Sequence, residues 1–181
     1  YKMNKKKINI NPGVLWITGL SGSGKTTISK LIFDQLKKKY KNIILLDGDS
    51  LRKKILSTPK SKFSYKGRKN IGLRYAHICK QYLKKNKYVI IAVMALIKDV
   101  HIWNKKNLEN YTDVYLNVPL KELKKRDPKK LYKMFEEKKI KNLAGVDLKY
   151  DIPKKPTIYI NWKKNISALN YAKKIIKKIK L

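Results

Sequence analysis

This chain of 181 residues contains the sequence Gly19-Leu20-Ser21-Gly22-Ser23-Gly24-Lys25-Thr26. It fits the pattern G-x-x-x-x-G-K-[ST] at every fixed position. Glycines at this spacing let the backbone fold into a nest whose N–H groups point at phosphate oxygens. In the same pattern, Lys25 supplies positive charge to the β- and γ-phosphates, and the Thr26 hydroxyl is a magnesium ligand. The stretch therefore predicts a phosphate-binding loop for a nucleoside triphosphate with Mg²⁺.

The residues on either side of this loop argue against a chance match in a chain rich in Lys, Ser and Gly. Residues 14–18 form a short apolar run, which predicts a buried strand. Residues 26–40 place Ile28, Ile32 and Leu36 on one face, which predicts a helix. The N-terminus of that helix adds the positive end of its dipole to the loop. Strand, loop and helix in this order are the context in which the motif binds phosphate.

Further apolar runs continue the alternation of strands and helices along the chain. The expected strands are residues 43–46, 88–93, 114–118 and 157–160. Most are apolar throughout, which is typical of parallel strands covered on both faces. The last segment, residues 166–179, has apolar residues at spacings of three and four; we expect it to cover the sheet, and binding to a membrane surface is the alternative. The prediction is a single α/β domain over residues 1–181: a doubly wound parallel sheet of about five strands with helices on both faces, preceded by a flexible stretch over residues 1–11.

The formal charge of +34 suggests a polyanion partner, but the residue types weaken that interpretation. Only four of the 46 basic residues are arginine, the usual choice for bidentate phosphate contacts. Lys, Ile, Asn and Tyr, whose codons are AT-rich, make up about half of the chain. We therefore expect solvated lysine faces and no specific nucleic-acid partner. The chain has no apolar run of membrane-spanning length, no visible signal peptide and a single cysteine, so we expect a cytoplasmic protein with no membrane partner.

Two carboxylates follow the second predicted strand, in Leu45-Leu46-Asp47-Gly48-Asp49. Ligands bind at the carboxyl ends of strands in open α/β sheets, and phosphoryl transfer needs carboxylates near the metal and near the attacking hydroxyl. We expect Asp49 to orient or deprotonate the acceptor and Asp47 to support magnesium. Arg52, one turn later, would face the same cleft and hold an anionic acceptor. An Asp-Gly-Asp turn without a chemical role is the alternative.

Taken with further motifs, these features resemble the adenylylsulfate (APS) kinase family, and the resemblance extends from about Gly13 to Trp162. The resemblance rests on the P-loop continued as Lys25-Thr26-Thr27, Leu46-Asp47-Gly48-Asp49 with Arg52, Phe63-Ser64, Val118-Pro119-Leu120, Arg126-Asp127-Pro128-Lys129, Leu131-Tyr132, and Ile140 to Asp147 followed by Tyr150 and Pro153. The family is commonly dimeric and transfers the γ-phosphate of ATP to the ribose 3′-hydroxyl of a nucleoside 5′-phosphosulfate. The resemblance therefore implies a P-loop kinase with ATP and Mg²⁺ as cofactors and a small nucleotide as acceptor.

The resemblance also implies roles for individual residues. The implied ATP-binding residues are Gly19, Ser21, Gly22, Ser23, Gly24, Lys25, Thr26, Thr27 and Arg126. Asp49 is implied as the catalytic carboxylate together with Lys25, and Thr26 and Asp47 as the metal-binding residues. The implied acceptor-binding residues are Asp49, Arg52, Phe63, Arg68, Asn70, Lys141 and Leu143. Residues 126–153 correspond to a mobile lid in which Asp147 helps to order the closed form; such a lid would keep water from the transferred phosphate.

The sequence departs from the family pattern mainly on the acceptor side. Residues 94–98 read Met-Ala-Leu-Ile-Lys where the family has Ile-Ser-Pro-Tyr-Arg, and Leu143 replaces the family's second stacking phenylalanine. The chain looks more like a divergent branch of the family, which includes the cytidine diphosphoramidate kinase of capsule phosphoramidate synthesis. With Leu143 in place of an aromatic residue, the acceptor's base has one stacking partner fewer than in the family pattern. An acceptor with a base smaller than adenine fits this replacement. The expected acceptor is cytidine diphosphoramidate; adenylyl sulfate is the alternative, and a non-catalytic nucleotide- or polyanion-binding module is a remoter one.

The two histidines and the cysteine are expected to have structural rather than catalytic roles. His77 lies in a predicted amphipathic helix, and phosphoryl transfer of this kind needs no histidine base, so we expect His77 and His101 to be structural. Cys79 is expected in the core rather than as a nucleophile.

Overall fold

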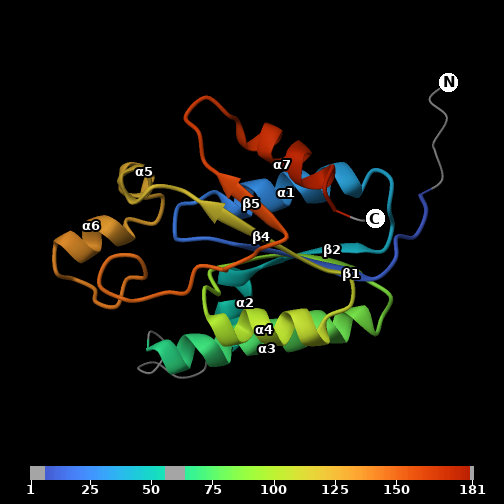
Figure 1. Cartoon of the computed structure of the whole chain (residues 1–181), viewed down its shortest axis with the longest axis horizontal. Coiled ribbons are helices and arrows are strands. Elements are labelled where there is room, and N and C mark those ends of the chain that lie inside the picture. Colours follow the sequence, from blue (N-terminus) through green and yellow to red (C-terminus); the bar gives the residue numbers. More distant parts are fainter. Residues whose placement is uncertain (1–6, 56–63, 180–181) are drawn as a thin grey trace.

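The structure is a computed structural model that describes residues 7–55 and 64–179. Five parallel strands form one sheet in the order β2-β3-β1-β4-β5 (Figure 1). They are β1 (Gly13–Thr18), β2 (Ile43–Asp47), β3 (Tyr88–Val93), β4 (Tyr111–Asn117) and β5 (Ile158–Asn161). The predicted α/β fold with a five-stranded parallel sheet is confirmed. Part of the predicted flexible stretch 1–11 and the predicted acceptor contact Phe63 lie outside the described residues.

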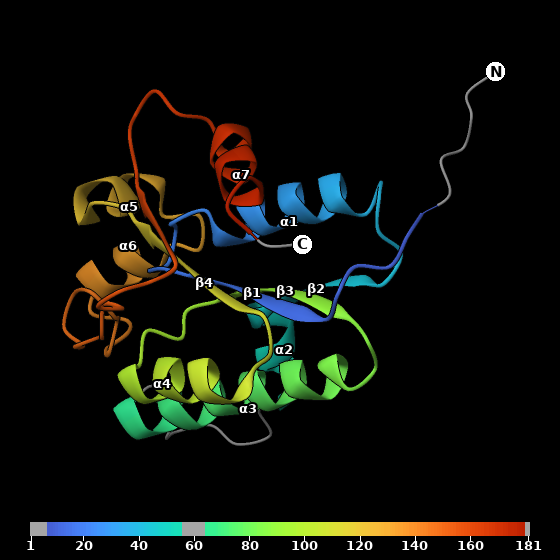
Figure 2. The ribbon, with the colours of Figure 1, turned by 45° about the vertical axis from the view of Figure 1, so that its right-hand side comes forward.

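Helices cover both faces of the sheet. The helices are α1 (Lys25–Leu36), α2 (Gly48–Ile55), α3 (Tyr65–Leu83), α4 (Lys98–Asn107), α5 (Leu120–Arg126), α6 (Leu131–Glu136) and α7 (Ala168–Ile176). In Figure 2, α1 and α7 lie above the sheet, α3 and α4 lie below it, and α5 and α6 lie beyond one end of the strands. Both views place α5 and α6 past the carboxyl end of β4 (Figures 1 and 2).

The central strands are buried on both sides, as their unbroken apolar composition predicts. Every residue of β1 and β3 is buried. Alternate residues of β1 enter two separate cores, because successive side chains of a strand point to opposite faces. Leu15 and Ile17 pack into the core under α1 and α7, whereas Val14 and Trp16 pack into the core above α3 and α4. Burial on both faces fixes the register of the strand that leads into the P-loop.

Two helices are shorter than their apolar patterns predict. The helix after the P-loop ends at Leu36 rather than at residue 40, because the chain turns through three lysines and brings Tyr40 into a parallel bridge with Ile8. The last helix begins at Ala168 rather than at residue 166, because the Ser167 hydroxyl accepts a hydrogen bond from the Asn170 N–H and caps it. This helix packs on α1 and buries Tyr171 and Ile175. No helix among residues 7–55 and 64–179 is long and apolar enough to span a bilayer.

His101 and Cys79 are both buried, which fits their predicted structural roles, whereas His77 is exposed and contacts the ring of Trp103 in a tilted arrangement, with the ring centroids 4.7 Å apart. Burial lowers the pKa of His101 below its usual value of 6.5. The facing charged groups act in both directions: Asp113 and Asp151 raise this pKa, and Lys105 lowers it. The neutral imidazole is therefore the form that the fold favours.

We expect the free energy of unfolding to decrease as the pH falls from about 6.5 towards the lowered pKa of His101. In this window the unfolded chain binds a proton that the folded chain does not, so acid favours unfolding, by at most about 1.4 kcal/mol for each unit of the pKa shift. Urea unfolding at pH 7.5 and 5.5 measures the effect. His101→Gln should reduce the pH dependence, and the control His77→Gln should not; equal pH dependence in all three proteins would contradict this assignment.

Candidate active site

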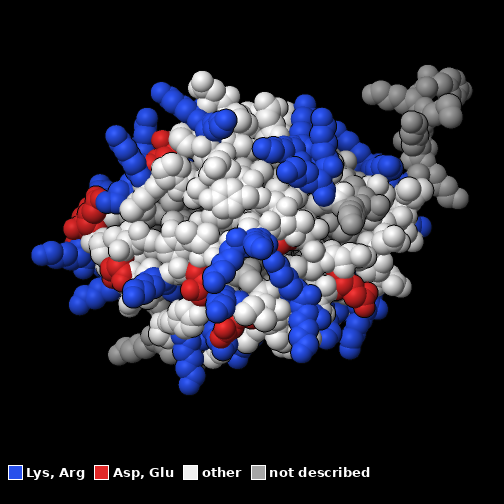
Figure 3. Space-filling view, viewed as in Figure 1, with Lys and Arg blue, Asp and Glu red and all other residues white. Residues whose placement is uncertain are grey.

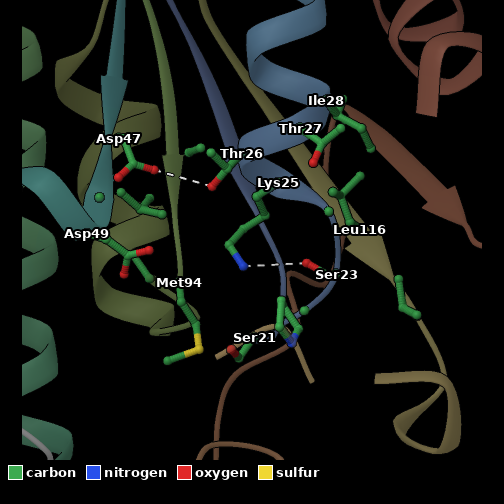
Figure 4. Close-up of a pocket in the computed structure, with 18 of the residues that line it drawn as sticks. Ser21, Ser23, Lys25, Thr26, Thr27, Ile28, Asp47, Asp49, Met94 and Leu116 are labelled. Carbon is green, nitrogen blue, oxygen red and sulfur yellow. Dashed lines mark hydrogen bonds between the residues drawn. The ribbon is translucent and has the colours of Figure 1, made fainter. Parts of the chain in front are cut away.

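A cavity of about 830 Å³ lies at the carboxyl ends of the central strands (Figure 4). This is the position at which open α/β sheets bind ligands. The structure brings most of the predicted site residues together here; the predicted residues that line the cavity are Ser21, Gly22, Ser23, Gly24, Lys25, Thr26, Thr27, Asp47, Asp49, Arg52, Arg68 and Arg126. In Figure 4 the P-loop lies between two sides of this cavity, with Asp47, Asp49 and Met94 on one side and Ile28 and Leu116 on the other.

The backbone of the P-loop adopts the conformation that its glycines permit. Gly22 and Gly24 have φ angles of 76° and 88°, a left-handed region that other residues rarely adopt. Gly19 does not line the cavity, but a Cβ atom there would lie 2.7 Å from Ser23 Oγ and 2.9 Å from the Leu116 carbonyl oxygen. Its role is therefore close packing of the loop against β4. These three glycines together hold the loop around a concave surface.

Lys25 extends along the inside of the loop. Its Nζ donates hydrogen bonds to the Leu20 carbonyl at 2.7 Å and to Ser23 Oγ at 3.5 Å. Burial, and to a smaller extent the charge of the nearby Lys129, lower the pKa of Lys25 to about 8, although Asp49 and Asp47 act in the opposite direction. An ammonium group placed here is poorly hydrated, so an anionic phosphate would strengthen its charged form.

The two carboxylates after β2 have different surroundings. Asp47 accepts a hydrogen bond from the Thr26 hydroxyl at 3.3 Å on one oxygen, and from the N–H and hydroxyl of Ser50 at 3.1 and 3.2 Å on the other. Asp49, in the first turn of α2, forms an ion pair with Lys129. Thus Asp47 is fixed beside the P-loop threonine, whereas the partner of Asp49 within the described part of the chain is a side chain from the segment predicted as a lid. Both side chains of this ion pair are about half exposed, and such pairs contribute little stability.

Gly48 separates the two carboxylates, and its position is tightly defined. A Cβ atom on Gly48 would lie 2.8 Å from both the Ala92 carbonyl oxygen and Val93 Cγ1, so the chain passes directly against the end of β3. The Gly48 carbonyl accepts a hydrogen bond from the buried Tyr75 hydroxyl at 3.0 Å. Tyr75 therefore connects α3 to the turn that carries Asp49.

We expect Tyr75→Phe to lower both the stability and the turnover of the protein. The substitution removes the side-chain hydrogen bond to the buried Gly48 carbonyl, which contributes about 0.5–1.5 kcal/mol. Because Asp49 follows Gly48 directly, a shift of this turn misplaces the carboxylate. Urea unfolding and steady-state kinetics measure the two effects. The control Tyr159→Phe alters a tyrosine on β5 that is 44% exposed and should change neither; a Tyr75→Phe protein with unchanged stability would contradict the role of this hydrogen bond.

Arg52 and Arg68, which were predicted to hold the acceptor, line the cavity together with Met94 and Ala95. The guanidinium of Arg68 donates a hydrogen bond at 2.8 Å to the Lys149 carbonyl in the segment predicted as a lid. Two residues further on, the carboxylate of Asp151 accepts hydrogen bonds from the Tyr65 hydroxyl at 3.0 Å and from the Lys98 N–H at 2.7 Å. The segment is therefore docked on α3 and on the start of α4.

Three predicted acceptor contacts do not line the cavity. Asn70 is exposed on α3, and Lys141 is exposed in the loop after α6. Leu143 is buried in a core cluster with Leu20 and Leu96, because its N–H donates to the Asp147 carboxylate at 2.6 Å and the loop folds its side chain inwards. Leu143 packs beneath the P-loop in this structure rather than against a base. The acceptor roles of these residues and of Phe63 stay predictions.

Several lining residues had no assigned role in the sequence. Lys129 pairs with Asp49, Tyr75 holds Gly48, and Trp162 lies under Arg126. Tyr132, outside the cavity lining, supports the P-loop by donating a hydrogen bond to the Ser21 carbonyl at 3.0 Å. Lys129 and Tyr132 belong to the motifs that carry the family resemblance, which is the one sequence signal that could have drawn attention to them.

A P-loop after the first strand, a carboxylate pair after the edge strand β2 and three arginines in the same cavity define a phosphotransferase of the P-loop class. The family model for adenylylsulphate kinase matches residues 11–161, and the chain belongs to this family. It is therefore a nucleotide kinase of the APS-kinase type, a phosphotransferase that acts on a hydroxyl group. The resemblance noted in the sequence is confirmed.

Individual relatives differ in the substrates that their names give. The chain is 36% identical over 173 residues to a cytidine diphosphoramidate kinase of Campylobacter jejuni, which covers 94% of this chain and 98% of that protein. It is 34% identical over 152 residues to an adenylyl-sulfate kinase of Pseudomonas aeruginosa, which covers 83% of this chain and 76% of that protein. Among solved structures, the Mycobacterium tuberculosis APS kinase in complex with AMPPNP and APS has a TM-score of 0.84 and 25% identity, covering 93% of this chain and 97% of that chain.

Proposed function

We propose that this protein transfers the γ-phosphate of magnesium-bound ATP to the ribose 3′-hydroxyl of a small nucleotide, and that the acceptor is cytidine diphosphoramidate. The observation that carries the proposal is the shared cavity of Lys25, Asp49, Arg52 and Arg68. In this cavity a lysine could bind the phosphates of ATP, a carboxylate could accept the proton of the ribose hydroxyl, and two guanidinium groups could bind the anionic group of the acceptor. The nearly full-length similarity to the Campylobacter jejuni kinase supports the choice of acceptor.

Thr26 and Asp47 would hold the magnesium ion. Their hydroxyl and carboxylate oxygens lie 3.3 Å apart, and Mg²⁺ prefers such hard oxygen ligands. Among residues 7–55 and 64–179 no group of three His, Cys, Asp or Glu side chains could form a complete metal cage. That fits a magnesium ion bound by one carboxylate, the P-loop hydroxyl and the substrate phosphates. Bound magnesium would neutralise charge on the β- and γ-phosphates.

Catalysis in this proposal consists mainly of positioning. The P-loop N–H groups and Lys25 hold the triphosphate, and Arg52 and Arg68 hold the anionic group of the acceptor. Asp49 accepts a hydrogen bond from the ribose 3′-hydroxyl and takes its proton as the phosphoryl group arrives. For this to happen, the ribose hydroxyl replaces Lys129 as the partner of Asp49. Residues 126–153 act as a lid that excludes water while the phosphate is transferred.

Adenylyl sulfate is the second candidate acceptor, supported by the Pseudomonas aeruginosa and Mycobacterium tuberculosis relatives. A non-catalytic polyanion-binding module is the remoter alternative. Figure 3 shows Lys and Arg side chains scattered over the visible face rather than gathered over one element. We infer that this charge supports solubility and not a specific nucleic-acid partner, and that the protein acts in the cytoplasm, where ATP is supplied. We also infer a homodimer, which sedimentation equilibrium tests.

The deciding experiment incubates the protein with Mg²⁺ and ATP plus either acceptor and follows ADP release, with NMR identification of the phosphorylated position. We expect turnover with cytidine diphosphoramidate and 3′-phosphorylation of its ribose. Turnover with adenylyl sulfate alone would replace the proposed acceptor by the second candidate. No turnover with either, together with tight and salt-dependent RNA binding, would favour the binding module. Omission of Mg²⁺ should abolish turnover.

A further inference from the structure

Residues 149–151, near the end of the segment predicted as a lid, are joined to two elements that line the cavity. The Lys149 carbonyl accepts the hydrogen bond from the guanidinium of Arg68 at 2.8 Å. The Asp151 N–H donates to the Leu96 carbonyl at 2.9 Å, in the loop between β3 and α4. Arg68 lines the cavity, and so does the first half of that loop. Residues 149–151 therefore connect two parts of the cavity wall, although none of them lines the cavity.

The carboxylate of Asp151 strengthens this connection. Its Oδ2 atom accepts hydrogen bonds from the Lys98 N–H at 2.7 Å and from the Tyr65 hydroxyl at 3.0 Å. Lys98 is the first residue of α4, and the preceding residue, Ile97, provides no side-chain cap for the free N–H groups of this helix. Asp151 therefore caps α4 from 53 positions further along the chain, and its negative charge is favourable at this end of a helix.

The same carboxylate lies close to Arg68. Tyr65 and Arg68 are three positions apart in α3, so their side chains lie on the same side of the helix. Burial lowers the pKa of Arg68, and the charge of Asp151 opposes this shift. Within the described part of the chain, the buried Nε–H of Arg68 has no hydrogen-bond partner. An unpaired buried N–H is unfavourable, and an anion bound in the cavity would provide the missing acceptor.

We propose that Asp151 is a positioning residue for the acceptor: it fixes residues 149–151 against α3 and α4, and so sets where the guanidinium of Arg68 meets the anionic group. The proposal rests on the proposed function for the role of Arg68. Asp151 does not touch the acceptor and acts through Arg68 and through the loop before α4. Residues 149–151 stay in place when the earlier part of the lid moves, so Asp49 is released while Arg68 keeps its bond to the Lys149 carbonyl.

Steady-state kinetics of Asp151→Ala, with cytidine diphosphoramidate and with adenylyl sulfate as acceptors, test this role. The kcat/KM for the acceptor should fall about 10- to 100-fold, because a binding group displaced by about 1 Å can cost up to 10²-fold. The loss should lie mainly in the KM for the acceptor, whereas the KM for ATP should change less than about twofold, since the P-loop is untouched.

Two milder variants separate the contacts of the carboxylate. Asp151→Asn keeps an oxygen for the Lys98 N–H and loses the charge that faces Arg68, so it should raise the KM for the acceptor less than Asp151→Ala does. Tyr65→Phe removes one of the two donors and should also have a smaller effect in the same direction. If Asp151→Ala does not fold, these two variants provide the same comparison of the two KM values.

Asp99→Asn is the matched control. Asp99 lies in the first turn of the same helix, pairs with Lys69 at 2.5 Å and does not line the cavity. The substitution removes the same charge from the N-terminal turn of α4 without altering residues 149–151. It should leave the KM for the acceptor and the KM for ATP unchanged.

Hydrogen exchange at the Lys98 amide provides a readout that needs no turnover. This amide should be protected in the wild type and in Asp99→Asn, and should exchange at least about tenfold faster in Asp151→Ala. An unprotected Lys98 amide in the wild type, or an unchanged KM for the acceptor in an active Asp151→Ala protein, would overturn the proposal and leave the proposed function standing. An equal rise in both KM values would show a general loss of structure and would also overturn it. A wild type inactive with both acceptors would reject the proposed function, and the positioning role with it.

Discussion

Replacing Asp49 by asparagine is expected to lower turnover at least about a hundredfold while ATP binding is preserved. Asparagine keeps the size of the side chain but cannot accept the proton of the ribose hydroxyl. Asp49 lines the cavity, and its ion-pair partner among the described residues is Lys129, so the carboxylate is available for an acceptor once this exposed ion pair opens. Steady-state ADP release gives the turnover, and calorimetry with Mg²⁺ and AMPPNP gives the nucleotide affinity.

The matched control is Asp34→Asn, on the exposed surface of α1, where Asp34 pairs with Lys30 at 3.0 Å. It removes the same charge away from the cavity and should leave turnover unchanged. Both variants should unfold at urea concentrations close to that of the wild type, since neither carboxylate is buried. Near-normal turnover of Asp49→Asn would refute the role of Asp49 as the acceptor's base, and a hundredfold loss in both variants would indicate a general effect of charge.

Asp49 and its neighbours show how far the sequence alone can lead. The P-loop motif and the unbroken apolar runs predict the order of strands and helices, because each is a local pattern with a local physical cause. The carboxyl ends of parallel strands meet at one edge, so a motif after β1 and another after β2 were expected to face one cavity, and they do. The strand order follows from long-range pairing, which no local pattern contains.

The surroundings of the residues predicted to bind the acceptor were harder to predict, because their contacts join segments far apart in the chain. The ion pair of Lys129 with Asp49 spans 80 positions, and the hydrogen bond from Arg68 to the Lys149 carbonyl spans 81. Family resemblance placed Leu143 at the acceptor, but its backbone bond to Asp147 directs the side chain into a core cluster instead. Two of the charged side chains predicted to serve the acceptor thus have partners in residues 126–153. We expect an acceptor hydroxyl that bonds to Asp49 to displace Lys129, which would couple acceptor binding to movement of that segment.

The affinity for magnesium-bound ATP is expected to fall as the pH rises above about 8, the pKa of Lys25. Desolvation is the main reason for this low pKa, and the charge of Lys129 adds to it. The ammonium form binds phosphate, so ATP raises the pKa of Lys25, and above pH 8 binding must first add a proton. By linkage the dissociation constant should increase up to about tenfold for each pH unit, until the pKa of the complex is reached. Calorimetry with AMPPNP between pH 7 and 9.5 measures this slope.

The variant Lys25→Met tests whether Lys25, rather than another ionisable group in the cavity, causes the pH dependence of nucleotide binding. The variant lacks the ammonium that faces the β- and γ-phosphates, so its turnover should fall by about 10²- to 10³-fold, the usual loss for one group that stabilises developing charge. Its residual nucleotide affinity should no longer change between pH 7 and 9.5. Lys30→Met, an exposed lysine on the same helix, is the control and should keep both the activity and the pH slope of the wild type. A wild-type affinity independent of pH, or an unchanged slope in Lys25→Met, would show that the titrating group is not Lys25, and the low pKa would then have no part in phosphate binding.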